Sequence, residues 1–109
     1  MFAFRYIRAH GDDQDTSLTQ QQERVDAYCT KRGYETSELF VDRLSTAVPW
    51  RERPGLILLM KRAQELAKQQ AVCVIVDIAY RLGRGEELLI IVALLQEYGA
   101  QVEFVLKEV

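Results

Sequence analysis

FAFRYIRAHGDDQD, residues 2–15 of this chain, has the pattern of a strand that enters a polar turn and then leads toward a helix. Its first half is rich in aromatic and β-branched side chains, which suit a pleated sheet. These side chains are Phe2, Phe4, Tyr6 and Ile7. The polar turn begins at His10, and Gly11 within it can take a positive φ. We expect the rest of the fold to be arranged around this strand and turn.

A helix is expected directly after the turn. Ser17 and Gln20 have the spacing of a capping box, which predicts a helix from about Ser17 to Arg32. A strand, a turn and a helix N-terminus in this order bring unpaired amides and the helix dipole together, and so favour an anion site. Arg8 and His10 lie at the strand end, where open α/β sheets bind ligands. The alternative is an ordinary strand–helix connection whose acidic residues face water.

The remainder of the chain alternates between short apolar strands and helical patterns. The other expected elements are a strand at 39–41, a loop at 42–52, a helix beginning near 53, a strand at 71–76, a helix at 85–98 and a strand at 102–106. This alternation predicts an α/β fold, with a parallel sheet of about four strands and helices on both faces. A length of 109 residues fits one domain.

In such a fold, the loops that follow the first three strands share one edge of the sheet. Polar residues from distant parts of the sequence should therefore lie near each other there. These residues are Arg8, His10, Asp42, Arg81 and Arg84. With Arg53, which begins the second helix, four arginines gather around one edge, and this is more than packing requires. Clustered guanidinium groups bind phosphate through bidentate contacts.

The composition restricts the classes of partner. The formal net charge is −2, which argues against strong duplex binding by this chain alone. The longest apolar run, residues 88–95, is too short to span a bilayer, and we find no signal peptide. The sequence therefore predicts a cytoplasmic protein that does not insert in membranes.

No cofactor or metal site is expected. Cys29 and Cys73 match no metal-binding or redox spacing, so we interpret them as buried thiols. A metal could in principle be held by the cluster of His10, Asp12, Asp13 and Asp15. Consecutive acidic residues in a loop usually face water, however, and the chain has no second histidine to complete a typical transition-metal set.

Three segments together resemble the N-terminal catalytic domain of the resolvase/invertase serine recombinases. They are YIRAHGDDQDTSLTQQ at 6–21, FVDRLS at 40–45 followed by RERPGL at 51–56, and YRLGRG at 80–85. In that family, arginines gather around a DNA phosphate, and a serine attacks it to give a 5′-phosphoserine link. The resemblance, together with the alternation of elements, implies a sheet in the order 2-1-3-4. It implies a phosphate-stabilising set of Arg8, Arg53, Arg81 and Arg84, supported by Gln21, Asp42 and Ser45.

The chain also departs from the family pattern. His10 stands where the family has its nucleophilic serine, and Tyr80 stands where an acid usually precedes the first arginine of the last motif. The sequence ends at Val109, before the long helix and the helix-turn-helix domain of these enzymes. We therefore expect residues 1–109 to form a single resolvase-like domain of the catalytic type, without the C-terminal DNA-binding domain.

The favoured hypothesis is a resolvase-like domain of a site-specific DNA recombinase that has lost strand cleavage. It would persist as a module that associates with the DNA phosphate backbone or with a protein. An imidazole is not a hydroxyl, so the phosphoserine intermediate cannot form at His10. The alternative is a phosphodiester-cleaving enzyme that uses His10 as its nucleophile or general base, with the arginines stabilising the developing charge.

The third expected helix predicts self-association. Residues 88–95 read LLIIVALL, which is apolar on every side of a helix, whereas a helix on one face of a sheet needs only an apolar stripe. A second copy of the chain is the simplest cover for the outer side. The sequence therefore predicts a homo-oligomer that associates through Leu88, Ile91, Leu94 and Leu95.

Overall fold

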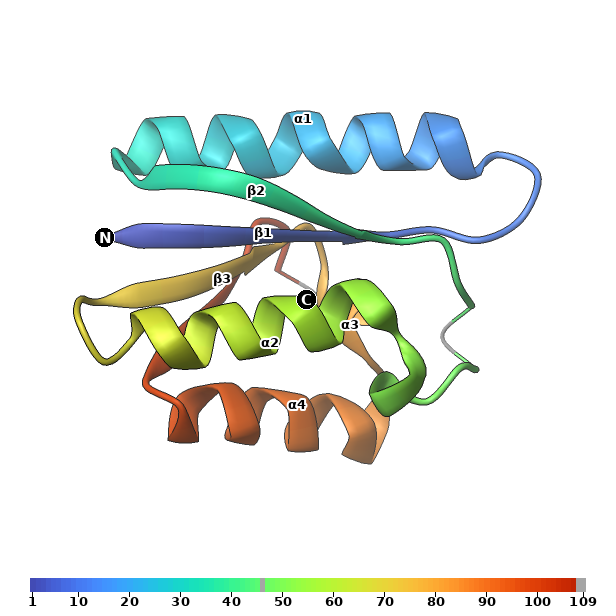
Figure 1. Ribbon diagram of the computed structural model, residues 1–109. Coiled ribbons are helices and arrows are strands. Elements are labelled where there is room, and N and C mark those ends of the chain that lie inside the picture. Colours follow the sequence, from blue (N-terminus) through green and yellow to red (C-terminus); the bar gives the residue numbers. More distant parts are fainter. Residues whose placement is uncertain (46, 108–109) are drawn as a thin grey trace.

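A four-stranded parallel sheet forms the centre of the computed structural model, which describes residues 1–45 and 47–107 (Figure 1). Its strands are β1 (Phe2–Arg8), β2 (Glu35–Asp42), β3 (Val72–Val76) and β4 (Ala100–Phe104). The spatial order is β2-β1-β3-β4, and each neighbouring pair is parallel. Both the predicted α/β class and the predicted order 2-1-3-4 are confirmed.

Helices cover both faces of this sheet. One face carries α1 (Gln14–Arg32), and the other carries α2 (Pro54–Leu66) and α4 (Gly85–Glu97), as Figure 1 shows. The loop before α2 contains a short 3₁₀ helix, η1 (Trp50–Glu52), and a single turn, α3 (Ala79–Leu82), follows β3. Every residue of β3 is buried, as expected for a central strand covered on both faces.

Side chains of alternate strand residues divide the core into two clusters. Phe4 and Tyr6 of β1 belong to the larger cluster, under α2 and α4. Ala3 and Ile7 belong to the smaller one, under α1. This two-sided burial fixes the register of β1, because a shift by one residue would exchange the two sets.

The N-terminus of α1 differs from the prediction. The helix begins at Gln14, and its N-cap residue, Asp13, makes no side-chain capping hydrogen bond. The capping box expected at Ser17 is therefore wrong. Main-chain bonds replace it: the Gln14 N–H donates to the Gly11 carbonyl and the Ser17 N–H to the Asp13 carbonyl. Gly11 makes this early start feasible, since its φ of 103° lies in the region that favours glycine.

The bounds of both edge strands differ from those predicted from the sequence. β2 begins at Glu35, four residues earlier than expected, because it pairs with β1 from Phe2 onward. The added residues 35–38 are exposed and polar, so they carry no apolar signal. β4 ends at Phe104, two residues earlier than expected. Edge strands commonly carry such polar stretches, which discourage pairing with other chains.

Helix α4 corrects the expected oligomer surface. Ile91 and Leu95 are 0% exposed and belong to the core of the monomer, so their predicted place at an interface is wrong. Leu88 and Leu94 are half-buried against the same core. The outward apolar residues are instead Leu89, 69% exposed, and Ile90, 48% exposed. A run of eight apolar residues does not reveal which side of the helix meets the sheet.

Both cysteines are buried and unpaired, as predicted. Cys29 and Cys73 belong to the cluster under α1. Burial raises the pKa of both thiols, that of Cys73 to about 12, so both remain protonated at neutral pH. Protonated buried thiols are poor nucleophiles and poor metal ligands. Separately, none of the described helices combines the length and the apolar character needed to cross a bilayer.

Candidate functional site

The carboxyl ends of β1, β2 and β3 bring most of the predicted site residues to one edge of the sheet. Arg8 ends β1, Asp42 ends β2 and Asp77 directly follows β3. The loop before α2 and the turn around α3 lie over the same edge, because carbonyl oxygens of both accept hydrogen bonds from buried arginines. The parallel sheet order therefore determines which residues meet there.

Arg8 is buried, with 2% of its surface exposed, and its side chain joins the two loops. Nε donates to the Arg81 carbonyl at 2.9 Å, Nη1 to the Leu44 carbonyl at 2.8 Å and Nη2 to the Tyr80 carbonyl at 3.2 Å. Burial lowers the pKa of Arg8, and the neighbouring Tyr6 and Tyr80 oppose this effect. In this structure the guanidinium faces main-chain carbonyl groups.

Gln21 holds the main chain of Arg8 from the opposite side. Its Oε1 accepts from the Arg8 N–H at 3.1 Å, and its Nε2 donates to the Arg8 carbonyl at 2.9 Å. The same Nε2 donates to Ser17 Oγ at 3.1 Å. Gln21 thus pairs with Arg8 as a neighbouring strand would, beyond Tyr6, where the ladder between β1 and β3 stops. The resemblance implied a supporting role for Gln21, and these hydrogen bonds show that its side chain contacts the main chain of Arg8.

Arg53 is fully buried between the loop before α2 and the turn before α4. Its Nε donates to the Val48 carbonyl at 3.1 Å and its Nη1 to the Leu82 carbonyl at 2.6 Å. Its Nη2 makes an ion pair with Glu87 in the first turn of α4. Glu87 therefore neutralises the charge of Arg53. The sequence did not predict this role, because an acidic residue near the start of a helix is common for other reasons.

Asp42 connects β1, β2 and α2 through one buried carboxylate. It accepts from the Tyr6 hydroxyl at 2.8 Å, from the Gly55 N–H at 2.7 Å and from the Leu56 N–H at 2.9 Å. The last two donors are otherwise unpaired amides of the first turn of α2. A Cβ on Gly55 would lie 2.7 Å from the Val41 carbonyl oxygen, so only glycine allows this approach. Burial and Asp42 raise the pKa of Tyr6, which stays protonated as a donor.

Arg81 and Arg84 surround the aromatic ring of Tyr80, together with Arg8. The guanidinium carbon lies 4.2 Å from the ring centroid for Arg84, 5.3 Å for Arg8 and 5.8 Å for Arg81. Arg81 Nη2 also donates to Ser17 Oγ at 3.3 Å, whereas its buried Nε has no partner among the described residues. Arg84 is exposed and stands at the N-cap position of α4. The sequence identified Tyr80 as a departure from the family pattern but did not predict its position among three arginines.

Among the described residues, the side chains of His10 and Ser45 make fewer hydrogen bonds than those of Arg8, Arg53 and Asp42. His10 is exposed in the turn after β1, and no hydrogen bond or ion pair within residues 1–45 and 47–107 involves its side chain. Ser45 Oγ accepts from the Ala47 N–H at 3.1 Å within its own loop. In the described part of the chain, no group of three or more His, Cys, Asp or Glu side chains is placed to hold a metal ion.

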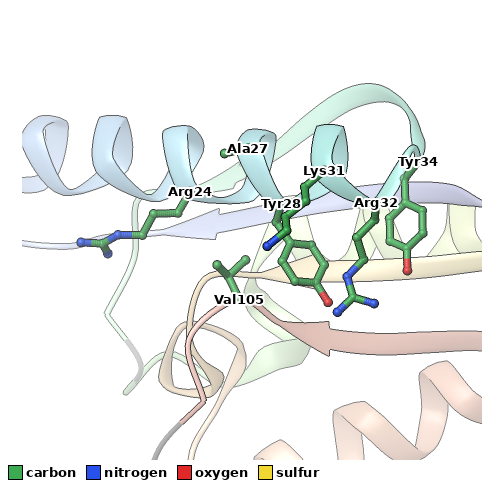
Figure 2. A pocket seen from close by; sticks show the side chains of 7 residues that line it. All are labelled: Arg24, Ala27, Tyr28, Lys31, Arg32, Tyr34 and Val105. Atoms are coloured by element: carbon green, nitrogen blue, oxygen red, sulfur yellow. The ribbon is translucent and has the colours of Figure 1, made fainter.

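A groove beside α1 is separate from this cluster, although it begins near it (Figure 2). Its volume is about 760 Å³, and its lining residues are Arg24, Ala27, Tyr28, Lys31, Arg32, Tyr34 and Val105. Arg24 is paired with Asp77 at 3.1 Å. Glu103 accepts from the Tyr28 and Tyr34 hydroxyls and lies 3.9 Å from Arg32. Four of the lining side chains therefore bind acids of the chain itself, and we place the candidate site at the strand ends.

The fold and the arginine-rich strand edge define an α/β domain of the recombinase type, and the comparisons with known proteins agree. The model of the family described as "Resolvase, N terminal domain" matches residues 3–108. The chain therefore belongs to the resolvase N-terminal domain family. Comparison with curated protein sequences finds no significant match.

Solved structures of recombinase domains have the same fold. The C-terminal catalytic domain of ISC1926 TnpA, an IS607-like serine recombinase, is 28% identical, with a TM-score of 0.84 over 99% of this chain and 69% of that one. The N-terminal catalytic domain of TP901-1 integrase is 20% identical, with a TM-score of 0.78 over 96% and 77% of the two chains. A resolvase family site-specific recombinase from Streptococcus pneumoniae is 19% identical, with a TM-score of 0.77 over 96% and 72%.

The geometry around Asp42 predicts that this position requires a carboxylate. In Asp42→Asn, one of the acceptor oxygens becomes an NH₂ group that faces buried donors, and we expect a loss of about 2–4 kcal/mol in the free energy of unfolding. Urea denaturation followed by circular dichroism measures this loss. Asp15→Asn is the matched control, since the Asp15 side chain is 85% exposed and should change stability by less than about 0.5 kcal/mol. Equal stability of the two variants would contradict the assigned role.

Proposed function

We propose that this domain is a non-cleaving recombinase module, which binds the phosphate backbone of DNA at the carboxyl edge of its sheet. The observation that carries this proposal is His10, which occupies the place of the nucleophilic serine in an otherwise arginine-rich edge. A phosphoserine link requires a hydroxyl at that place. Family membership and the convergence of the arginines support retention of phosphate binding after loss of the nucleophile.

Within the arginine set, the contacts support a division of labour. Arg8 and Arg53 direct their N–H groups at the carbonyls of the two loops, and so they position the edge. Arg84 is exposed, and Arg81 keeps a buried Nε without a partner among the described residues. In this proposal, Arg81 and Arg84 contact the phosphate. Gln21 and Asp42 support the edge from behind through the contacts given above.

The net charge of the whole chain affects the strength of phosphate binding. A net charge of −2 opposes long-range capture of duplex DNA, whereas the local arginine cluster attracts a phosphate at short range. The resulting affinity should be weak and sensitive to salt. Such behaviour suits a module that is brought to DNA by another protein or domain and then contacts the backbone.

A titration with inorganic phosphate tests the binding. We expect backbone amide shifts at Arg81 and Arg84 that saturate at low salt and disappear at high salt. Arg84→Gln removes a charge-assisted contact, so the affinity should fall by about tenfold or more. Arg62→Gln is the control, because Arg62 lies on α2 and is paired with Glu38. The absence of shifts at low salt, or an equal effect of both variants, would argue against the site.

Incubation with nicked and supercoiled DNA tests the absence of cleavage. We expect no covalent protein–DNA adduct and no change in DNA topology, because the edge has an imidazole in place of the hydroxyl. The reaction is stopped at alkaline pH, since a histidine phosphoramidate is labile in acid. An adduct that forms with the wild-type chain and is lost in His10→Ala would overturn this proposal and establish the alternative, in which His10 acts as the nucleophile.

Self-association is a second proposal, and the exposed aliphatic side chains favour it. Leu89 and Ile90 project outward from α4, and Ile57 and Leu58, 39% and 40% exposed, do so from α2. These two helices lie on the same face of the sheet (Figure 1). Large exposed apolar residues on neighbouring elements are typical of interaction surfaces. A second copy of the chain would bury them across a twofold axis.

Light scattering at ~100 µM, well above the dissociation constants of weak specific pairs, tests this interface. We expect a dimer that dissociates when Leu89→Glu and Ile90→Glu are combined, because both side chains would bury a charge at the contact. Gln22→Glu adds a charge at an exposed position of α1, on the opposite face of the sheet, and should leave the dimer intact. A monomeric wild-type chain at this concentration would remove the proposal.

A further inference from the structure

Three guanidinium groups converge on the ring of Tyr80, and the ion pairs of the described residues give none of them a carboxylate partner. Arg5, Arg24, Arg32, Arg43, Arg53 and Arg62 each make an ion pair with an acidic side chain. Arg8, Arg81 and Arg84 make none among the described residues. Their shared neighbour is the ring of Tyr80, with all three guanidinium carbons within 5.8 Å of its centroid. This separation lies in the range of cation–π attraction.

We propose that Tyr80 is the positioning residue of the phosphate site: its ring gathers Arg8, Arg81 and Arg84 by cation–π attraction and leaves N–H groups of Arg81 and Arg84 available to an anion. This inference rests on the proposed phosphate-binding function. Like charges at such distances repel each other, and an apolar side chain at position 80 would offer no compensation. The negative face of the ring supplies it.

The chemistry of the ring differs from that of a carboxylate in one decisive respect. A carboxylate accepts hydrogen bonds from the guanidinium fork, and so it occupies the donors that a phosphate needs and cancels their charge. An aromatic face attracts the same cation without accepting its in-plane N–H groups. The cluster around Tyr80 therefore keeps its full positive charge, in a chain whose net charge is −2. An anionic phosphate group, such as that of a phosphodiester, is the ligand chemistry that fits such a cluster.

The backbone around Tyr80 holds the ring in place. The Tyr80 carbonyl accepts from Arg8 Nη2 at 3.2 Å, so Arg8 is fixed by both the main chain and the ring of this residue. Leu82 is fully buried. A Cβ on Gly83 would lie 3.2 Å from the Leu88 nitrogen, so the turn from α3 into α4 is closely packed. This packing positions the main chain of Arg84 next to α3, and its guanidinium carbon lies 4.2 Å from the ring centroid.

The test uses two measurements, one of which needs no ligand. In the free protein, side-chain proton resonances of Arg84 should be shifted upfield by the ring current of Tyr80. Tyr80→Phe keeps the ring and should keep these shifts, with a phosphate affinity within about twofold of wild type. Tyr80→Leu should abolish the shifts and weaken phosphate binding by about fivefold or more, the loss of one or more cation–π contacts. Tyr80→Asp should also weaken phosphate binding, because its carboxylate would compete with phosphate for the guanidinium N–H groups.

Two further variants make the result decisive. Tyr34→Leu removes a partly buried tyrosine from the distant end of the groove beside α1 and should change neither measurement. Tyr80→Met replaces Tyr80→Leu if the latter fails to fold. Wild-type Arg84 resonances at random-coil positions, or a Tyr80→Leu chain that binds phosphate as tightly as wild type, would overturn the inference. Upfield shifts without any phosphate binding would support the gathering role and contradict the proposed function instead.

Discussion

The buried guanidinium of Arg8 is the constraint on which the strand edge depends. A charge removed from water is tolerated only when hydrogen bonds replace its hydration, and here the replacement comes from carbonyl groups of two loops. Leu44 lies in a loop, and Tyr80 and Arg81 lie in the single turn α3, so the conformation of both segments is tied to the presence of the cation. Gln21 fixes the main chain of the same residue, and its position in turn depends on α1. One side chain thus couples the sheet, a helix and both loops.

The central elements could be predicted from the sequence because burial on defined faces leaves a pattern. β1 and β3 carry continuous or alternating apolar residues, and α2 has a clear apolar stripe. The polar first half of β2 left no such pattern, because an edge strand pairs through its main chain and exposes its side chains. The sequence also did not predict which side of α4 faces the sheet. Eight consecutive apolar residues fit the sheet in any rotation, and the packed core selects Ile91 and Leu95.

For the candidate site, the sequence predicted which residues meet but not how they are oriented. Parallel topology brings Arg8, Asp42 and Arg81 to one edge regardless of side-chain detail. Whether an arginine faces solvent or a carbonyl depends on loop conformations, and these have no periodic signal. The position of Tyr80 among the arginines and the pairing of Glu87 were not predicted for the same reason, since each depends on a contact between segments far apart in the chain.

The burial of Arg8 and Arg53 has a consequence for how such chains change over time. Selection for a folded domain maintains both arginines whether or not any phosphodiester is ever attacked, because each fills a closed space and binds several carbonyls. A nucleophile exposed in a turn carries no comparable structural duty, so it can drift freely once activity is dispensable. In this chain, the presence of Arg8 and Arg53 is therefore explained by the fold alone and is not evidence of strand cleavage.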